Sequence, residues 1–218
     1  MAEQISYRVR RVQRGRRLKV RVDPEHGVEV LVPAGVPLRL AGSAVAELEP
    51  WLRDQLDRRS RLRAELRPDG TLPYLDERLV LVAQDGRTRA QRRGAQLLVP
   101  AGADGPAAIE RWYRRAARAE IAPRLDAAAA ASGTRYAHLS IRNQRTRWAS
   151  CGSGGAMSFN WRLLLAPERV LDYVVWHEVC HLEVADHSPR FWALLESRCP
   201  AWREPAAWLR VYGSVLVL

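Results

Sequence analysis

The sequence predicts an α+β fold, because strand-like and helix-like stretches occupy separate parts of the chain. Residues 5–32, 78–82 and 96–99 alternate apolar and polar side chains, which is typical of half-buried strands. The apolar spacing of amphipathic helices begins near residues 43, 107 and 167. A chain of 218 residues can bury a substantial core, either as one domain with an appendage or as two small domains.

The front of the chain predicts short antiparallel strands followed by a helix. The runs ISYRVRRV, RLKVRV and VEVLV supply the strands within residues 5–32, and DPEHG forms the second turn. Ser43 is expected to cap the helix that follows, and Pro50 to kink its early turns. With the runs at 78–82 and 96–99, these elements make an N-terminal α+β module over residues 1–103.

A Gly/Pro break, PAGADGP, separates this module from a second domain over residues 104–218. Its first element is a helix from about Ala107 to Ala131, which Pro123 is expected to bend and Gly133 to end. The runs YAHLSIRNQRTRWAS and AMSFNWRLLL then predict two strands. The glycines of the intervening CGSGG allow the tight turn of a hairpin.

Composition predicts a soluble cytoplasmic protein with no membrane partner. No apolar run approaches the roughly 18 residues of a membrane-spanning helix, and the N-terminus does not resemble a signal peptide. Cys151, Cys180 and Cys199 form no even disulfide framework, which favours a reducing compartment. Nothing in the sequence indicates an oligomeric state.

The chain is strongly basic, with 35 Lys plus Arg against 24 Asp plus Glu and a formal net charge of +11. Such an excess attracts polyanions or simply keeps a surface solvated. Because no nucleic-acid-binding motif accompanies it, nucleic acid remains one of two expectations for the basic N-terminal region. Eight bases lie within 14 residues without an intervening acid: Arg8, Arg10, Arg11, Arg14, Arg16, Arg17, Lys19 and Arg21.

The stretch APERVLDYVVWHEVCHLEV predicts a helix that carries chemistry, with Pro167 at its first position. At 3.6 residues per turn, His177 and His181 lie on one face and can reach a single metal ion. Glu178 is rotated by roughly 100° from His177, so it suits contact with a water molecule rather than with the metal. The alternative is a chance gathering of polar residues on an amphipathic helix.

A catalytic zinc ion normally has three protein ligands, and His187 can supply the third. Ser188 and Pro189 predict the start of a new helix, so the chain must turn just before it and can return His187 to the other two histidines. Metzincin proteases use the same spacing with a glycine where Val184 stands, so a turn through Ala185 and Asp186 is expected here. We therefore predict a Zn²⁺ site with Glu178 as general base and His177, His181 and His187 as ligands.

Two neighbours of this motif have open roles. Cys180 is either a soft metal ligand or a small buried packing residue, and its type favours packing. Asp186 either accepts a hydrogen bond from a ligand imidazole or shapes the turn.

The run RTRWASCGSGGAMSFNWRLLLAPERVLDYVVWHEVCHLEVADHSPRFW resembles the YgjP-like metallopeptidase domain, a zincin related to SprT-like and WLM (Wss-type) proteases. The RW-x-SC and NWRL pieces, DYVV before HExxH and HSPxFW after it carry the resemblance, and VEVLVPAGVP extends it to the front module. The resemblance implies a zincin-like catalytic domain, in which a mixed or antiparallel sheet packs on the HExxH helix. It also implies zinc held by the three histidines and Glu178 as base. The family commonly has Gly at Ala149 and Asn at Asp186.

Zincins generally pair an extended peptide with a strand beside the active-site helix, and SIRNQRTRWAS is the candidate for that edge. The predicted function is therefore zinc-dependent cleavage of polypeptides, including DNA-associated proteins. A first alternative is a metal-dependent nucleoside triphosphate hydrolase, although no glycine-rich phosphate loop is present. A second alternative is a non-enzymatic nucleic-acid-binding module with structural zinc, which would need a fourth ligand.

Overall fold

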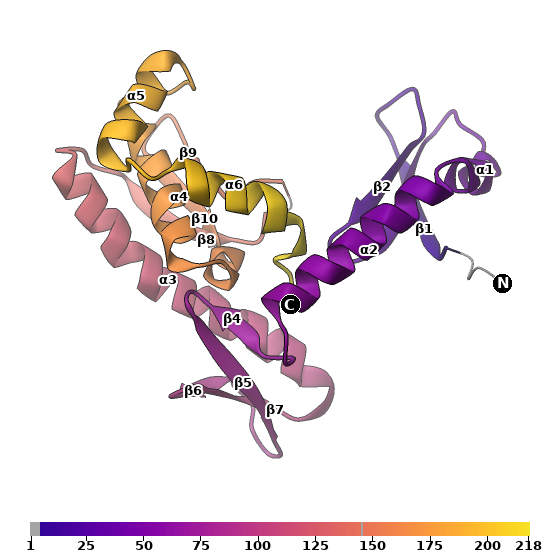
Figure 1. The fold of residues 1–218 in the computed structure, drawn as a ribbon, viewed down its shortest axis with the longest axis horizontal. Coiled ribbons are helices and arrows are strands. Elements are labelled where there is room, and N and C mark those ends of the chain that lie inside the picture. Colours follow the sequence, from indigo (N-terminus) through magenta and orange to yellow (C-terminus); the bar gives the residue numbers. More distant parts are fainter. Residues whose placement is uncertain (1–4, 145) are drawn as a thin grey trace. The chain divides into compact units, whose positions relative to one another are not determined.

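The computed structural model describes residues 5–144 and 146–218 and has the predicted α+β composition. The described part of the chain forms two compact units, of which the first ends at Leu66 and the second begins at Arg67 (Figure 1). Within the described ranges, no helix has the length and apolar character that a bilayer crossing requires.

The first unit contains a three-stranded sheet with the order β1-β3-β2. Its strands are β1 (Tyr7–Val12), β2 (Lys19–Asp23) and β3 (Gly27–Pro33). The prediction of antiparallel strands holds for β2 and β3 but is wrong for β1, which pairs with β3 in parallel. β3 carries the most buried side chains of the three strands, and the central position lets it bury them while both of its edges are hydrogen-bonded.

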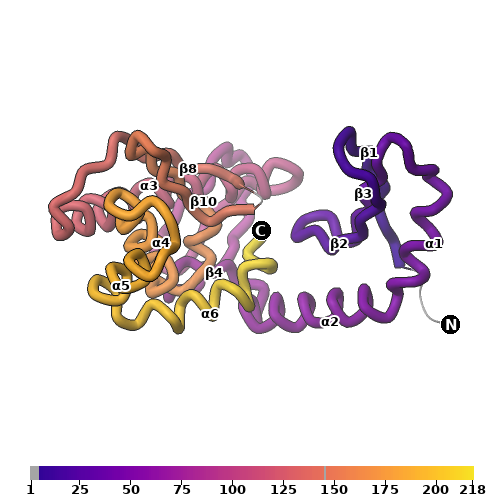
Figure 2. The backbone as a smooth tube through the Cα atoms, turned by 90° about the horizontal axis from the view of Figure 1, so that it is seen from above, coloured from indigo at the N-terminus to yellow at the C-terminus, as the bar shows by residue number. Residues whose placement is uncertain are grey.

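Two helices pack on one face of this sheet, α1 (Leu40–Glu47) and α2 (Glu49–Leu66), and Figure 2 shows the long α2 following directly after α1. The prediction that Ser43 caps a single helix is wrong, because Ser43 lies inside α1. The helix is interrupted at Leu48 rather than kinked, so that Pro50 lies in the first turn of α2. Proline is tolerated there because the amides of a first turn have no partner within the helix. The core is formed by Val28, Val30, Val32, Ala41, Val45 and Leu52.

The second unit begins with a four-stranded sheet of order β4-β5-β7-β6. The predicted strands at 78–82 and 96–99 are present as β5 (Glu77–Gln84) and β7 (Gln96–Pro100). The short strands β4 (Leu72–Tyr74) and β6 (Gln91–Arg93) were not predicted, since three residues are too few for an alternation to be visible.

This sheet belongs to the second unit because its first strand is tied to later parts of the chain. The hydroxyl of Tyr113 donates to the carbonyl of Pro73 at 2.5 Å, and the amide of Leu75 donates to the carbonyl of Leu164 at 2.8 Å. The compact units therefore divide after Leu66. The division into functional domains at 103/104 remains a prediction.

A long helix, α3 (Gly105–Ala131), follows the short 3₁₀ helix η1 (Gly102–Asp104) and confirms the predicted element. Pro123 lies inside it, and Gly133, with φ of 63°, stands just beyond its end. Its buried side chains recur every four residues and make one continuous face: Ile109, Tyr113, Ala117, Ile121 and Leu125.

The third sheet has the order β8-β10-β9 and consists of β8 (His138–Arg142), β9 (Ala149–Cys151) and β10 (Ala156–Asn160). The predicted hairpin joins β9 and β10 with antiparallel pairing, whereas β8 pairs with β10 in parallel. The second predicted strand is too long, because Trp161–Leu165 form a buried 3₁₀ helix, η2. The side chain of Asn160 accepts a hydrogen bond from the amide of Arg162 and starts that helix.

Three helices complete the unit: α4 (Glu168–Cys180), α5 (Pro189–Arg198) and α6 (Arg203–Tyr212), followed by the 3₁₀ helix η3 (Gly213–Val215). α4 packs between α3 and the two later helices (Figure 1). It ends at Cys180, four residues before the end of the predicted helical stretch at Val184, because the chain passes into turns from His181. The turn before α5 is therefore free to bring its residues back toward α4.

Candidate metal centre

Helix α4 holds the central residues of the site in a fixed position. Its apolar face is buried, with Val170, Leu171 and Val179 all inaccessible to solvent. Near its start, the guanidinium group of Arg124 from α3 forms ion pairs with Glu168 and with Asp172, the latter at 3.1 Å. Packing and charge therefore fix both the rotation and the axial position of α4.

The structure brings His177, His181 and His187 together. Each offers one ring nitrogen, and the three nitrogens lie within 4.8 Å of one another. The Nε2 atoms of His177 and His187 are 3.0 Å apart, and the ring centroids of His181 and His187 are 4.7 Å apart. The outlying histidine thus turns back over the end of α4, as the sequence predicted. Among the described residues, this triad is the group of side chains that can hold a metal ion.

Backbone contacts beyond α4 set this turn without the glycine that metzincins use. Val184 is 8 % exposed and packs against Phe191 and Leu195, and its carbonyl lies 3.0 Å from Nδ1 of His181. This contact places the proton of His181 on Nδ1 and leaves Nε2 as the donor atom for a metal. A backbone carbonyl therefore orients this imidazole.

Asp186 shapes the turn. Its Oδ1 atom accepts a hydrogen bond from the amide of Ser188 at 3.2 Å, directly before α5. Of the two roles that the sequence left open for Asp186, the structure shows this one. An asparagine could make the same bond through its side-chain oxygen, so the departure at this position leaves the turn intact.

An aromatic wall surrounds the three imidazoles. Phe191, which is fully buried, lies with its ring centroid 4.9 Å from His177, 4.5 Å from His181 and 4.8 Å from His187. Trp192 lies 5.6 Å from His187 and stacks on Trp202 at 4.9 Å. Phe191 and Trp192 both belong to the first turn of α5. The start of this one helix therefore provides both rings that contact His187.

Burial keeps the imidazoles of His177 and His181 neutral, which is the state that binds metals. Burial, together with the charges of the neighbouring His181 and His187, lowers the pKa of His177 to about 3. Burial likewise lowers the pKa of His181, although its bond to Val184 opposes that shift. Nδ1 of His177 is buried and has no hydrogen-bond partner among the described residues.

Glu178 is buried beside the triad, with 6 % of its surface exposed. Burial raises the pKa of its carboxyl to about 7, against the opposing effects of a hydrogen bond from the amide of Cys151 and of the charge on Arg147. Its Oε2 atom has no partner within the described part of the chain. A carboxyl with this pKa can take up and release a proton near neutral pH.

Strand β9 passes beside α4 and lies at the edge of its sheet. Part of the predicted substrate-pairing segment, SIRNQRTRWAS, thus forms an edge strand whose Cys151 amide reaches the carboxyl of Glu178. Asn160, which is 2 % exposed, holds the preceding loop through hydrogen bonds to the carbonyls of Gln144 at 2.7 Å and Arg147 at 3.4 Å. The sequence did not assign this role to Asn160.

Cys180 is a packing residue. It is fully buried against Phe191 and Leu195, and Nη1 of Arg198 lies 3.9 Å from its sulfur. The remaining histidines lie elsewhere, since His138 is exposed on β8 and His26 sits in the β2–β3 turn beside Asp23. The structure therefore gathers His177, Glu178, His181 and His187 and leaves the other two histidines outside.

The model of one family, described as YgjP-like, metallopeptidase domain, matches residues 16–212. No curated protein and no solved structure gives a significant match.

Proposed function

Because the chain belongs to the YgjP-like metallopeptidase domain family, we propose that it is a zinc metallopeptidase with Glu178 as its general base. Family membership supports a metal-dependent hydrolase that acts on polypeptides. The convergence of His177, His181 and His187 beside a buried glutamate is the observation that carries the specific proposal. A cytoplasmic location stays a prediction.

The donor set and its spacing suit zinc. Tetrahedral Zn²⁺ bound at about 2.0–2.1 Å by two imidazoles places their nitrogens about 3.3 Å apart. The 3.0 Å between Nε2 of His177 and Nε2 of His187 is close to that value. Without a cation, two neutral rings at this distance must share a proton, so an ion relieves the crowding of donor atoms.

The proposed mechanism assigns a proton-transfer role to Glu178. When bound, zinc supplies Lewis acidity toward the scissile carbonyl oxygen and toward water. Glu178 accepts the proton of the attacking water and then delivers it to the nitrogen of the leaving amine. Its raised pKa keeps the carboxyl near the point of protonation at neutral pH, and the Cys151 amide orients the carboxylate. A nearby divalent cation favours the ionised form, which is the form a base needs.

The edge of β9 is the proposed place for the peptide. An extended chain can add to an edge strand through main-chain hydrogen bonds, which give affinity with little sequence specificity. The contact between the Cys151 amide and Glu178 supports this position, because it puts the strand edge next to the base.

Neither alternative function gains a specific observation. A closed structural zinc site needs a fourth protein ligand. The sulfur of Cys180 faces Arg198, and the carboxylate of Asp186 faces the Ser188 amide. A nucleoside triphosphate hydrolase remains an outcome that the experiment below can detect.

We further propose proteins bound to DNA as substrates, because the N-terminal region is strongly basic. This part predicts that DNA stimulates cleavage and that the stimulation fades as salt rises. Equal cleavage with and without DNA at low salt would remove it while leaving the peptidase proposal intact.

The experiment that tests the peptidase proposal compares wild type with Glu178→Gln. The variant should keep stoichiometric zinc in elemental analysis but lose casein hydrolysis, because glutamine cannot accept the proton. Glu47→Gln, which makes the same chemical change at an exposed position at the end of α1, serves as the matched control. Parallel incubation with nucleoside triphosphates measures phosphate release. Retained casein turnover in Glu178→Gln, or phosphate release without peptide cleavage, would overturn the proposal.

A further inference from the structure

The two faces of the sheet in the first unit differ in chemistry. Cross-strand partners share a face, so the pairing register places Arg8, Glu29 and Arg21 in one row and Arg10, Leu31 and Lys19 in the next. The opposite face carries the valines that pack under α1 and α2. The face turned away from these helices is therefore basic. We call it the basic face, together with the loop that joins β1 to β2: Arg8, Arg10, Arg14, Arg16, Arg17, Lys19 and Arg21.

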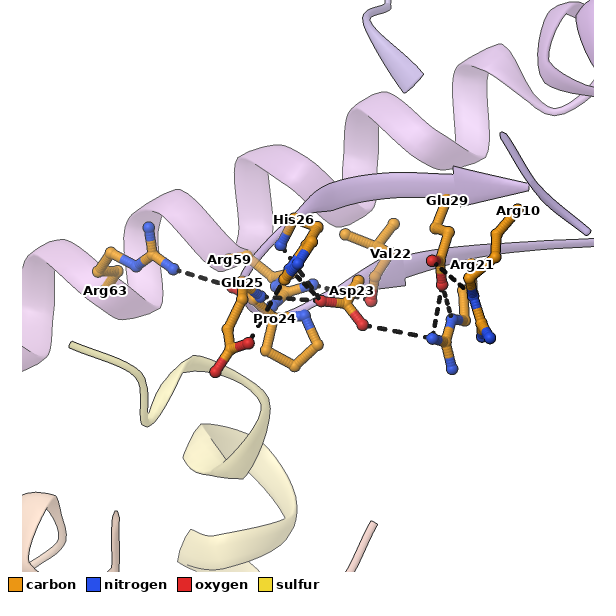
Figure 3. Close-up of polar contacts among 10 residues, drawn as sticks. All are labelled: Arg10, Arg21, Val22, Asp23, Pro24, Glu25, His26, Glu29, Arg59 and Arg63. Atoms are coloured by element: carbon orange, nitrogen blue, oxygen red, sulfur yellow. Dashed lines mark hydrogen bonds and ion pairs between the residues drawn. The ribbon is translucent and has the colours of Figure 1, made fainter. Parts of the chain in front are cut away.

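The acids of this face are buried beneath its arginines. Glu29 is 5 % exposed and accepts hydrogen bonds from Nε of Arg10 at 3.0 Å and from Nη2 of Arg21 at 2.6 Å (Figure 3). Burial would raise the pKa of Glu29, but the bonds and charges of Arg21 and Arg10 outweigh it and hold the pKa below its usual value. Asp23, which is 3 % exposed, contacts Arg21 and His26. The ionised Glu29 thus fixes two guanidinium groups in place without offering negative charge to solvent.

Five cations of the basic face have no partner among the residues that the structure describes. They are all exposed: Arg8, Arg14, Arg16, Arg17 and Lys19. Some arginines elsewhere are paired with acids, as Arg124 is with Glu120 and Arg114 is with Glu110. Clustered unpaired cations repel one another, and a bound polyanion relieves that repulsion.

We propose that the basic face binds the phosphate backbone of duplex DNA without reading its sequence. Duplex DNA carries one phosphate charge per about 1.7 Å of axis, so several phosphates can face a cluster of this kind at once. Binding of single strands generally relies on aromatic side chains that stack on the bases. The basic face has none, because Tyr7 lies in the row of Val28 on the opposite face. Phosphates are therefore the groups that this surface can recognise.

The inference extends the substrate part of the proposed function but is tested separately from it. The contacts belong to the first unit and involve no catalysis. Binding is therefore measured with full-length, zinc-loaded Glu178→Gln, which turns over no substrate. Failure to bind DNA would refute the basic face alone, and failure of peptide cleavage would refute the metallopeptidase assignment alone.

The experiment measures the affinity for a fluorescently labelled duplex of random sequence by fluorescence anisotropy, at a series of salt concentrations. If about five phosphates are neutralised, affinity should fall on the order of 500-fold between about 50 and about 200 mM salt. The variant Arg8→Gln/Arg16→Gln/Lys19→Gln should reduce that fall to about tenfold. The control Arg61→Gln/Arg89→Gln/Arg93→Gln removes the same charge from exposed positions outside the basic face and should keep the wild-type salt dependence.

Equal losses in the two triple variants would show a non-specific charge effect and overturn the proposal. So would tighter binding to the single strand or to anionic phosphatidylserine vesicles than to the duplex. Glu29→Gln provides a test of opposite sign, because it removes the carboxylate that neutralises Arg10 and Arg21, and should tighten duplex binding. Circular dichroism melting verifies that each variant is folded. If Glu29→Gln does not fold, the comparison of the two triple variants tests the proposal by itself.

Discussion

Replacing His187 by alanine should weaken zinc binding about 100-fold or more while leaving the metal-free fold intact. Structural zinc sites with four ligands contribute about 10–16 kcal/mol, which is roughly 3 kcal/mol per ligand. The loss of one imidazole from the triad should therefore cost about that amount. His187 is exposed, and its Nε2 atom lies 3.0 Å from that of His177, so its main contribution is to the ion rather than to the core.

Competition with a chromophoric zinc chelator measures this affinity, and calorimetry of the chelated protein measures the stability of the fold. His138→Ala, which removes an exposed histidine on β8, is the matched control and should bind zinc as wild type does. Unchanged zinc affinity in His187→Ala would refute the third ligand. A large drop in the melting temperature of the metal-free variant would instead show that His187 acts through the fold.

Three further predictions concern the surroundings of the site and the first unit. Phe191→Ala should lower the free energy of unfolding by roughly 3–5 kcal/mol and weaken zinc binding, because a fully buried ring beside all three imidazoles is lost. Denaturant titration of the metal-free protein measures the loss of stability, and competition with a chelator measures the loss of zinc affinity. Asn160→Ala should lower the free energy of unfolding by about 1–3 kcal/mol, because the carbonyl of Gln144 and the amide of Arg162 lose their partner. It should also lower kcat, because these bonds position the segment before β9. A variant with wild-type kcat and wild-type stability would contradict this prediction. The lowered pKa of Glu29 means that its contribution to stability is present above its ordinary value of about 4.5 and is lost as pH falls through the lower folded value. Thermal melting in acid should therefore show a smaller pH dependence in Glu29→Gln than in wild type.

Local spacing allowed much of the site to be predicted. His177 and His181 lie one turn apart on any helix, and Ser188–Pro189 is a helix start in many contexts, so both features follow from the nearest neighbours in sequence. The glycines of CGSGG likewise placed the β9–β10 hairpin. These elements needed only backbone geometry and residue type.

Longer-range features escaped the sequence patterns. The parallel pairing of β1 with β3 depends on which strand becomes central, and alternation is the same for either direction. The run Trp161–Leu165 is apolar enough for a buried strand, and the cap from Asn160 and the surrounding core decide in favour of a 3₁₀ helix. The compact units divide after Leu66 because β4 bonds to η2 and α3, which are distant in sequence.

By itself, the sequence determined the helix that carries HExxH, a third histidine six residues after the second and the excess of basic residues near the N-terminus. The tertiary structure decided that Val184 orients His181, that Phe191 closes against all three rings and that Glu178 lies buried beside Cys151. The physical reason is the distance along the sequence over which each effect acts. Helical periodicity acts over four residues, whereas burial, the pKa of a carboxyl and the partner of a ring nitrogen depend on atoms that only packing brings together.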